Sequence, residues 1–476
     1  MKKSIITLCV GTMILSVMSF SLPEEKKKGI EGYWLGVLDV GTPLRIGFNI
    51  TIEQDGSLKA TMDSPDQGAK DLSVDSATFE NSTLTIVYEQ AGLRYTATYS
   101  EETDDLKGTL EQAGMKLELN MKKVDEPPRV FRPQDPSKPY PYREEEVSYE
   151  NAEGGITLTG TLTMPKEGGG PFPAVILITG SGAQNRDEEI MGHRPFLVLA
   201  DYLTRRGIAV LRVDDRGVGG STGDISESTS EDFAGDVLAG VKYLKGLPEI
   251  DQKKIGLCGH SEGGIIAPIA ASRSKDVAFI VLMAGTGLTG EEILYLQGAL
   301  IARASGVPED KIQENIDDQK RIFAVVNNFE DPEIIKAELK KLFDEDLKTM
   351  SEEDRGKMAP DPETAFKVQV KQVLSKWFRY FLKYDPKTAL REVKCPVLAI
   401  NGTLDLQVPY KENLEAIEDA LKEGGNTDYT LKELPGLNHL FQKALTGAPT
   451  EYVKISETIN PAALQTIGDW IQARVK

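Results

Sequence analysis

A proline-rich stretch divides the chain into two segments with different sequence patterns. Its prolines are Pro127, Pro128, Pro133, Pro136, Pro139 and Pro141. Proline lacks the backbone N–H that regular pairing requires, so this stretch favours an extended, semi-rigid spacer. The length of 476 residues also exceeds what one hydrophobic core usually organises. We therefore predict two domains joined by a linker at residues 124–144.

The segment before the linker has the pattern of a small all-β domain. Apolar and polar residues alternate in short stretches, with turn residues such as Asp55-Gly56 between them. The clearest stretches are Leu44 to Glu53, Leu84 to Glu89, Arg94 to Ser100 and Met115 to Met121. We predict a barrel or sandwich over residues 30–123, with Trp34 packed in its core.

Beyond the linker, strand patterns alternate with helix patterns. The strand candidates are Val147 to Tyr149, Leu158 to Met164, Ala174 to Ile178, Ala209 to Val213, Lys254 to Cys258, Phe279 to Met283, Val397 to Ile400 and Tyr429 to Leu434. Such alternation predicts an α/β domain over residues 145–476, with a mainly parallel sheet and helices on both faces. Between the strand patterns that end at Met283 and begin at Val397, the sequence is charged and has helical periodicity. This segment predicts a helical cap at about 287–390 and includes Glu291 to Ala304 and Pro332 to Leu347.

One serine stands in the context of an exposed nucleophile. Gly259-His260-Ser261-Glu262-Gly263 matches Gly-x-Ser-x-Gly, directly after the strand pattern Lys254 to Cys258 and before the helical run Gly264 to Ser272. A second match, Gly219-Gly220-Ser221-Thr222-Gly223, precedes a loop-like stretch rich in Ser and Glu. We predict Ser261 as the nucleophile and Ser221 as a loop residue.

A serine hydroxyl needs a base, and the chain has three histidines. His260 adjoins the serine and His193 precedes it, whereas His439 lies in a loop after the last strand pattern. We therefore predict His439 as the base. Asp405 follows the strand pattern that ends at Ile400 and is predicted to orient His439; Asp428, the competing carboxylate, precedes a strand.

Two backbone N–H groups are predicted to form an oxyanion hole. Glu262 N–H lies at the start of the helix that follows the serine, where the helix dipole favours negative charge. Its side chain is interpreted as a polar neighbour. The second donor is predicted at Ser181, with Gly182 as the alternative, in the glycine-containing loop after Ile178. Arg186 and Asp187, further along that loop, are expected to form an ion pair with each other.

Composition excludes several other chemistries. The histidines lack zinc-binding spacing, and Cys258 and Cys395 accompany apolar strand patterns as buried thiols would, so we expect no metal site. The formal net charge is −19, which repels nucleic acid and anionic lipid surfaces. A small-molecule substrate is the expected partner, and the oligomeric state is left open.

The first residues have the pattern of an export signal. Lys2 and Lys3 precede an apolar run from Ile5 to Met18, with small residues before Pro23. The run is short for a membrane span. We predict a signal peptide at residues 1–22, a periplasmic or secreted protein, and no stable membrane span after cleavage.

Several motifs together resemble the α/β-hydrolase superfamily. They are Ile178-Thr179-Gly180-Ser181-Gly182, Asp214-Asp215-Arg216-Gly217, Gly259-His260-Ser261-Glu262-Gly263-Gly264, Gly402 to Asp405 and Asn438-His439. The chain is most similar to bacterial EstD-type carboxylesterases, relatives of the serine aminopeptidase and dienelactone hydrolase branches, some of which carry an N-terminal β domain. Many relatives have His-Gly where this chain has Thr179-Gly180. The resemblance implies that a short-acyl ester is cleaved through an acyl-enzyme on Ser261, without a cofactor.

Two other functions stay open at this stage. A serine peptidase of aminopeptidase or dipeptidyl peptidase type uses the same triad, and cap carboxylates such as Glu291, Glu292 or Asp344-Glu345-Asp346 could bind its substrate's amino terminus. A catalytically inactive binding protein is disfavoured by the complete set Ser261, Asp405 and His439. Cap aromatics are expected either to select the substrate or to form the cap's own core: Trp377, Phe378, Tyr380, Phe381 and Tyr384.

Overall fold

A computed structural model describes most of the chain. The described residues are 29–39, 43–53, 55–65, 69–112, 115–125, 132–166, 168–350 and 362–476. The predicted signal peptide, residues 1–22, lies outside them, as do parts of the predicted linker and cap. None of the helices within these ranges is long and apolar enough to cross a membrane.

The described residues form two compact units. The β unit comprises the described residues up to Arg132 together with Met191–His193, and the α/β unit comprises Pro133–Ile190 and Arg194–Lys476. Each unit has its own hydrophobic core.

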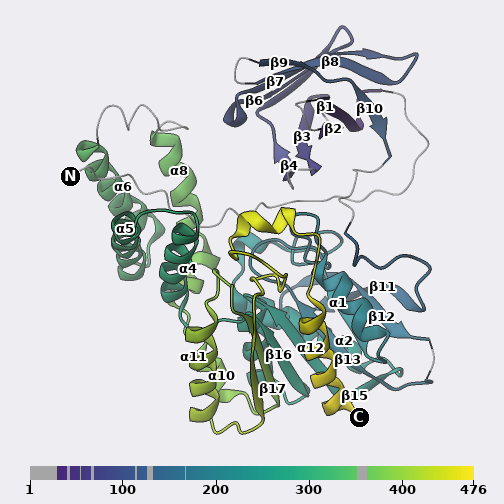
Figure 1. Ribbon diagram of the computed structural model, residues 1–476, viewed down its shortest axis with the longest axis vertical. Helices are drawn as coiled ribbons and strands as arrows, with labels where there is room; N and C mark the ends of the chain where they lie inside the picture. The colour runs from purple at the N-terminus through teal and green to yellow at the C-terminus, as the bar shows by residue number, and fades with distance from the viewer. Residues whose placement is uncertain are drawn as a thin grey trace. The chain divides into compact units, whose positions relative to one another are not determined.

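The β unit is a closed antiparallel barrel (Figure 1). Its strands are β1 Gly32–Asp39, β2 Pro43–Ile52, β3 Leu58–Ser64, β4 Ala69–Ser73, β5 Ser76–Glu80, β6 Thr83–Tyr88, β7 Leu93–Ser100, β8 Asp105–Gln112, β9 Met115–Glu118 and β10 Met121–Val124. The order β10-β1-β2-β3-β5-β6-β7-β8 closes because β10 pairs with both β1 and β8, while β4 and β9 lie outside the ring. Of the two predicted architectures, a barrel or a sandwich, the structure has the barrel. The predicted stretch Met115 to Met121 is divided between β9 and β10.

The barrel interior is filled by large apolar side chains. Trp34 and Phe48 are fully buried, and Tyr95 stacks on Phe48 with ring centroids 5.2 Å apart. The Trp34 indole N–H donates to the Ile30 carbonyl at 2.7 Å. Trp34 thus takes the predicted place in the core.

The α/β unit is built on an eight-stranded sheet of order β11-β12-β14-β13-β15-β16-β17-β18. Its strands are β11 Tyr142–Asn151, β12 Ile156–Pro165, β13 Phe172–Ile178, β14 Ala209–Val213, β15 Ile250–His260, β16 Phe279–Met283, β17 Val397–Gly402 and β18 Tyr429–Leu434. The first two are antiparallel to their neighbours, and the other six run parallel. The predicted mainly parallel sheet after an all-β domain is confirmed.

Helices cover both faces of this sheet (Figure 1). One face packs on α1 Pro195–Thr204 and α12 Pro461–Val475. The other packs on α2 Ser230–Lys245, α3 Gly263–Arg273, α10 Lys387–Glu392 and α11 Tyr410–Glu423. The helix α2 begins at a capping box, in which Thr229 and Asp232 each satisfy the other's backbone N–H. Helices on both faces explain why the strands read as nearly continuous apolar runs.

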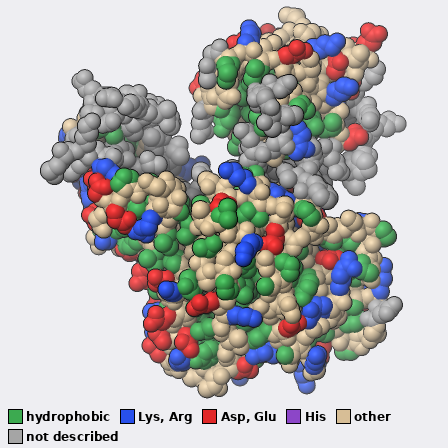
Figure 2. Space-filling model, viewed as in Figure 1, with side chains coloured by type: hydrophobic (Ala, Val, Ile, Leu, Met, Phe, Trp, Pro, Cys, Tyr) green, Lys and Arg blue, Asp and Glu red, His purple; other side chains and the backbone are tan. Residues whose placement is uncertain are grey.

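A group of helices between β16 and α10 forms the cap. They are α4 Gly290–Ala304, α5 Glu309–Asn328, α6 Pro332–Thr349, α8 Pro362–Val373 and α9 Lys376–Lys383. Their apolar faces meet in a separate core that contains Phe323, Phe366 and Phe378. Figure 2 shows acidic and basic side chains interspersed over the described part of one face of the molecule.

Candidate active site

The carboxyl ends of the parallel strands bring the predicted residues to one edge of the sheet. The pairings Ile178 with Gly259, His260 with Met283 and Gly402 with Leu434 show that these strands end at about the same level. Ligands of open α/β sheets bind at this edge. The loops that carry Ser181, Ser261, Asp405 and His439 all leave the sheet there.

Ser261 lies on a sharp turn between β15 and α3. Its φ is 54°, a left-handed conformation that is uncommon for a residue with a Cβ. A Cβ on Gly259 would come within 1.9 Å of the Gly263 carbonyl oxygen, so the turn can close only around glycine. The Ser261 amide donates to the Met283 carbonyl at 2.9 Å, and the Ser261 carbonyl accepts from Gly264 at 2.9 Å. Both bonds hold this strained turn in place, as a nucleophile elbow requires.

His439 and Asp405 form a buried hydrogen-bonded pair. The distance from His439 Nδ1 to Asp405 Oδ2 is 2.9 Å, and both residues are almost fully buried. The other carboxylate oxygen of Asp405 accepts the amides of Gln407 and Val408 at 2.9 and 2.8 Å. The hydrogen bond to Asp405 occupies Nδ1 of His439. It leaves Nε2 as the nitrogen that could take a proton from a serine.

The competing carboxylate lies elsewhere. Asp428 precedes β18, and its side chain is exposed and paired with Arg474 at 2.8 Å. Its carbonyl accepts the amide of Val397, the first residue of β17. Asp428 therefore belongs to the opposite edge of the sheet from His439.

The loop after β13 lies against the elbow. A Cβ on Gly180 would be 3.3 Å from the Cβ of Ser261. The Gly180 amide donates to Glu188 Oε1 at 2.8 Å and is therefore occupied. By contrast, the amides of Ser181 and Glu262 form no hydrogen bond with another described residue. The two predicted oxyanion donors are thus available at positions that flank the nucleophile.

The Glu262 side chain joins the elbow to two other elements. Its Oε1 accepts the Ser230 hydroxyl from α2 at 2.6 Å and the Trp377 indole N–H from cap helix α9 at 2.8 Å. Burial raises the pKa of Glu262, against these two hydrogen bonds, which lower it. The predicted polar neighbour is thus a buried carboxyl that ties the cap to the elbow.

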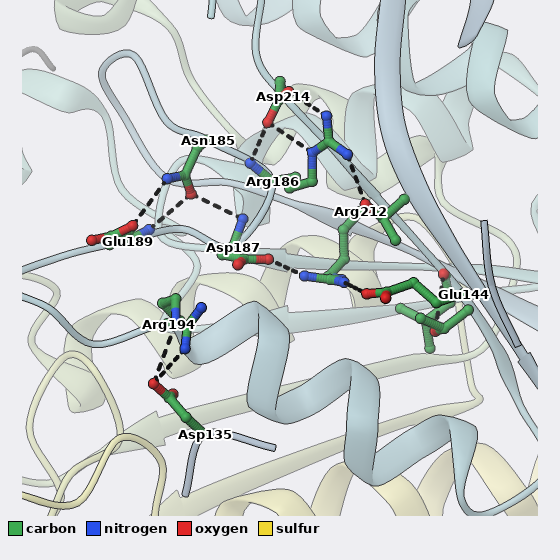
Figure 3. Close-up of polar contacts among 12 residues, drawn as sticks. Asp135, Glu144, Asn185, Arg186, Asp187, Glu189, Arg194, Arg212 and Asp214 are labelled. Atoms are coloured by element: carbon green, nitrogen blue, oxygen red, sulfur yellow. Dashed lines mark hydrogen bonds and ion pairs between the residues drawn. The ribbon is translucent and has the colours of Figure 1, made fainter. Parts of the chain in front are cut away.

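The prediction of an ion pair between Arg186 and Asp187 is wrong. Arg186 pairs with Asp214, at 2.7 Å between Nη2 and Oδ2, and Asp187 pairs with Arg212 (Figure 3). Arg212 and Asp214 are two residues apart on and just after β14, so they present opposite charges on the same side of that strand. Each loop residue therefore finds a partner on the strand, and the loop is fixed through β14.

Cap aromatics contribute to the cap's own core, the second of the two expected roles. Phe378 is buried in the cap core, whereas Trp377 stacks on Phe381 at 5.1 Å while its indole N–H reaches the elbow. The Tyr380 hydroxyl donates to Glu231 at 2.9 Å. Helix α9 thus both builds the cap core and attaches the cap to the sheet.

The described residues contain no cluster of three or more His, Cys, Asp or Glu side chains placed to hold a metal ion. Cys258 is fully buried beside Met283, and burial raises the pKa of its thiol. Ser221 is also buried, with its hydroxyl donating to the Asp214 carbonyl at 2.8 Å and accepting from the Thr159 amide at 2.9 Å. Its structural role agrees with the prediction that it is a loop residue.

Comparison with known proteins places the chain in a family. The model of the X-Pro dipeptidyl-peptidase (S15) family matches residues 154–432, more than half of the chain. The chain belongs to this family. It is a member of the α/β-hydrolase superfamily, as its sheet order and motifs indicated.

Its similarity to curated proteins points to esterases. The S15-family chain is 26% identical to the esterase EstD of Thermotoga maritima over 316 residues, which cover 66% of the chain and 65% of EstD. It is 33% identical to the esterase FrsA of Yersinia enterocolitica over 135 residues, 28% of the chain and 30% of FrsA. The matched region therefore spans just under two thirds of EstD and less than one third of FrsA. A solved esterase of Pyrococcus furiosus, Pf2001, aligns with 74% of the chain and 99% of its own at 20% identity and a TM-score of 0.42.

Sequence reasoning missed the polar residues behind the site of this S15-family chain. Adjacency to Ser261 argues against His260 as the base, and no sequence motif marks Glu188. In the structure the His260 ring lies 4.7 Å from the His439 ring, between centroids, and bonds Glu188. Nothing local in the sequence links residues 72 positions apart. The local signal in the sequence is the acidic pair Glu188-Glu189 in the loop after the strand pattern that ends at Ile178.

Proposed function

We propose that the protein is a serine hydrolase that cleaves short-acyl carboxylic esters with Ser261, Asp405 and His439. The observation that carries the proposal is the buried pair of His439 and Asp405 at the sheet edge where Ser261 occupies a strained, left-handed turn. Strained residues cluster at active sites because the surrounding structure must hold them. The esterase relatives support the choice of ester over other acyl substrates.

The proposed reaction has two steps. Ser261 Oγ attacks the ester carbonyl while His439 Nε2 takes its proton, and the alcohol leaves with that proton. Water, activated by His439 in the same way, then releases the acid from the acyl-enzyme. Asp405 stabilises the imidazolium in both steps, and the amides of Ser181 and Glu262 donate to the oxyanion. These roles require no cofactor.

A peptidase is the second candidate, because the family is named for X-Pro dipeptidyl peptidases. Four of the five cap carboxylates considered for binding an amino terminus have other partners. Glu291 accepts from Tyr295 and Asn327, at 2.7 and 2.8 Å, and Glu292 belongs to the capping box of α4. In the acidic run of α6, Asp344 pairs with Lys340 and Asp346 with Arg321. These contacts favour the ester substrate.

The test is hydrolysis of p-nitrophenyl acetate, butyrate and octanoate beside a panel of aminoacyl and Xaa-Pro p-nitroanilides. We expect ester turnover, fastest on the short acyl chains, that disappears in Ser261→Ala. The matched control is Ser221→Ala, which alters the serine of the other Gly-x-Ser-x-Gly match and should keep most of the turnover. Anilide cleavage without ester turnover would establish the peptidase. Ester turnover that survives Ser261→Ala would refute the assignment of the nucleophile.

We also propose that the protein is exported, from the pattern of residues 1–22. Its periplasmic or secreted location is tested by fractionating the producing cells and sequencing the amino terminus of the recovered protein. A terminus shortly after residue 22 is expected. Full-length protein in the cytoplasm would refute export.

A further inference from the structure

Both ring nitrogens of His260 face hydrogen-bond acceptors. The distance from Nδ1 to Glu188 Oε1 is 2.9 Å, and the distance from Nε2 to the His439 carbonyl oxygen is also 2.9 Å. A carbonyl oxygen cannot donate, and the same Glu188 oxygen already accepts the Gly180 amide at 2.8 Å. When Glu188 is ionised, a neutral imidazole with its one N–H can satisfy only one of these acceptors, whereas the imidazolium satisfies both. With Glu188 as a carboxylate, the geometry therefore assigns two protons to His260.

Glu188 is held in an unusual conformation to make these contacts. Its φ is 51°, in the left-handed region, and its side chain is about 1% exposed. A buried carboxylate without a cation is costly, so the imidazolium and the carboxylate require each other. Left-handed residues other than glycine cluster where function over-determines the backbone. Glu188, like Ser261, is such a residue at this sheet edge.

The pair connects two parts of the proposed catalytic machinery. Glu188 fixes the amide of Gly180, the residue before the predicted oxyanion donor Ser181. His260 fixes the carbonyl of His439, and it is itself the residue before Ser261. One buried chain of hydrogen bonds thus runs from the oxyanion loop, behind the nucleophile, to the loop of the base.

We propose that Glu188 and His260 are positioning residues: a carboxylate–imidazolium pair that sets the distance between the oxyanion hole and His439. The proposal rests on the proposed hydrolase function. A displacement of about 1 Å in such a constellation can reduce the rate about a hundredfold, so a pair that fixes both sides contributes to turnover without contacting the substrate.

The electrostatic surroundings of His260 agree with this protonation. Burial lowers the pKa of His260, but the Glu188 carboxylate, the two hydrogen bonds and Asp405 raise it, and the net direction is upward. The charged and titratable groups that face the ring are Glu188, Asp405 and His439, from the loops after β13, β17 and β18. A rise in pH that removes the second proton of His260 would release the His439 carbonyl.

Glu188→Gln tests the pair while keeping an acceptor for the Gly180 amide. Neutral His260 then loses one of its two bonds, so we expect kcat to fall about tenfold to a hundredfold with KM within about twofold. The alkaline limb of the pH profile should move to lower pH. Glu189→Gln, the matched control in the same loop, should leave kcat and the pH profile unchanged. A Glu188→Gln variant with wild-type kcat and pH profile would overturn the proposal.

A double-mutant cycle with His260→Gln asks whether the two residues act as one unit. Residues that act together give non-additive losses, so Glu188→Gln combined with His260→Gln should lose about as much as the worse single variant. If the fold-losses of kcat in the two single variants multiply in the double variant, the two residues act independently, and this result would overturn the proposal that they act as a pair.

Histidine NMR reads the protonation directly, since the chain has only three histidines. With ¹⁵N-labelled histidine and assignment by His260→Gln, both nitrogens of His260 should be protonated at pH 7 in the wild type and one in Glu188→Gln. A single proton in the wild type would overturn the proposal.

Labelling of Ser261 by a fluorophosphonate, expected to slow in Glu188→Gln, separates the two proposals. An unlabelled wild type would defeat the hydrolase function, whereas equal labelling rates would defeat the positioning role alone.

Discussion

The two units of the molecule use buried polar groups in opposite ways. In the β unit, the Tyr33 hydroxyl donates to the buried carboxylate of Asp63 at 2.6 Å on the strand faces opposite to core residues Trp34 and Met62, and the barrel core itself is aromatic and aliphatic. The sheet edge of the α/β unit instead buries Glu188, His260 and Glu262 beside the pair of Asp405 and His439. A fold does not need such a concentration of buried charge for stability, because apolar residues of similar volume often serve as well. The difference indicates where the molecule has a chemical task.

Left-handed backbone separates the units in the same way. In the barrel it occurs in turns: Asn81 and Ser82 join β5 to β6, and Asp104 precedes β8. In the α/β unit, the non-glycine residues with this conformation are Glu188, Ser261, Ala284 and Phe441, all in loops that follow the carboxyl ends of parallel strands. Strain in a hairpin serves chain reversal, whereas strain at the sheet edge presents side chains. We therefore expect mutations to separate into those that change the rate and those that change barrel stability.

The largest expected effect tests the α/β side of this comparison. Asp405→Asn keeps the shape of the side chain but favours the wrong His439 tautomer, so kcat should fall about ten-thousandfold. The urea concentration at the midpoint of barrel unfolding should equal that of the wild type. Steady-state kinetics and a urea titration with two spectroscopic probes measure both effects.

The control for that variant is Asp428→Asn, which removes a carboxylate at the other edge of the sheet. Its pairing with Arg474 is largely exposed, so the rate should stay within about twofold of wild type. A large rate loss in Asp428→Asn, or a small one in Asp405→Asn, would contradict the assignment of the third triad residue.

The next effect should appear in the barrel alone. Trp34 is fully buried, and Trp34→Ala should lower the free energy of unfolding of the barrel by about 3–5 kcal/mol. Ester turnover should stay within about twofold of wild type while the barrel is folded. Far-UV circular dichroism and turnover measured across one urea series test this. A parallel loss of turnover would show that the barrel supports the active site and would end the comparison.

The sequence predicted what periodicity and chain order determine. Phe279 to Met283 and Tyr429 to Leu434 match their strands because apolar runs between turn residues report burial. Ser261, Asp405 and His439 were predicted to lie together because each follows a parallel strand, and such strands end at one edge. Ion-pair partners could not be predicted as well from the sequence. Arg186 was predicted to pair with its neighbour Asp187, although its partner is Asp214, which follows β14. Long-range pairs such as Glu188 with His260 depend on loop conformation, which no local pattern encodes.

A third effect is the pH dependence of stability in the α/β unit. The folded-state pKa of His260 is raised, so its contribution is complete below the ordinary value of 6.5 and is lost as pH rises through the folded pKa. Across that window stability should fall with a slope of up to about 1.4 kcal/mol per pH unit. Urea titrations from pH 6 to 9 measure it. His260→Gln should flatten the slope, and an unchanged slope in that variant would assign the dependence to another group.

The smallest expected effect concerns the contact between cap and elbow. Trp377→Phe keeps the stacking on Phe381 but removes the indole donor to Glu262, leaving Ser230 as the donor to that oxygen. One lost hydrogen bond should lower the stability of the α/β unit by about 1 kcal/mol and raise the pKa of Glu262 further. Because the contact orders the cap, KM should rise by a few fold with kcat nearly unchanged.

The matched control is Trp470→Phe. The Trp470 indole donates to Thr430 at 3.2 Å, and its removal should leave KM unchanged. If Trp377→Phe instead lowers kcat and leaves KM alone, the contact supports the Glu262 amide in the oxyanion hole and does not act through the order of the cap.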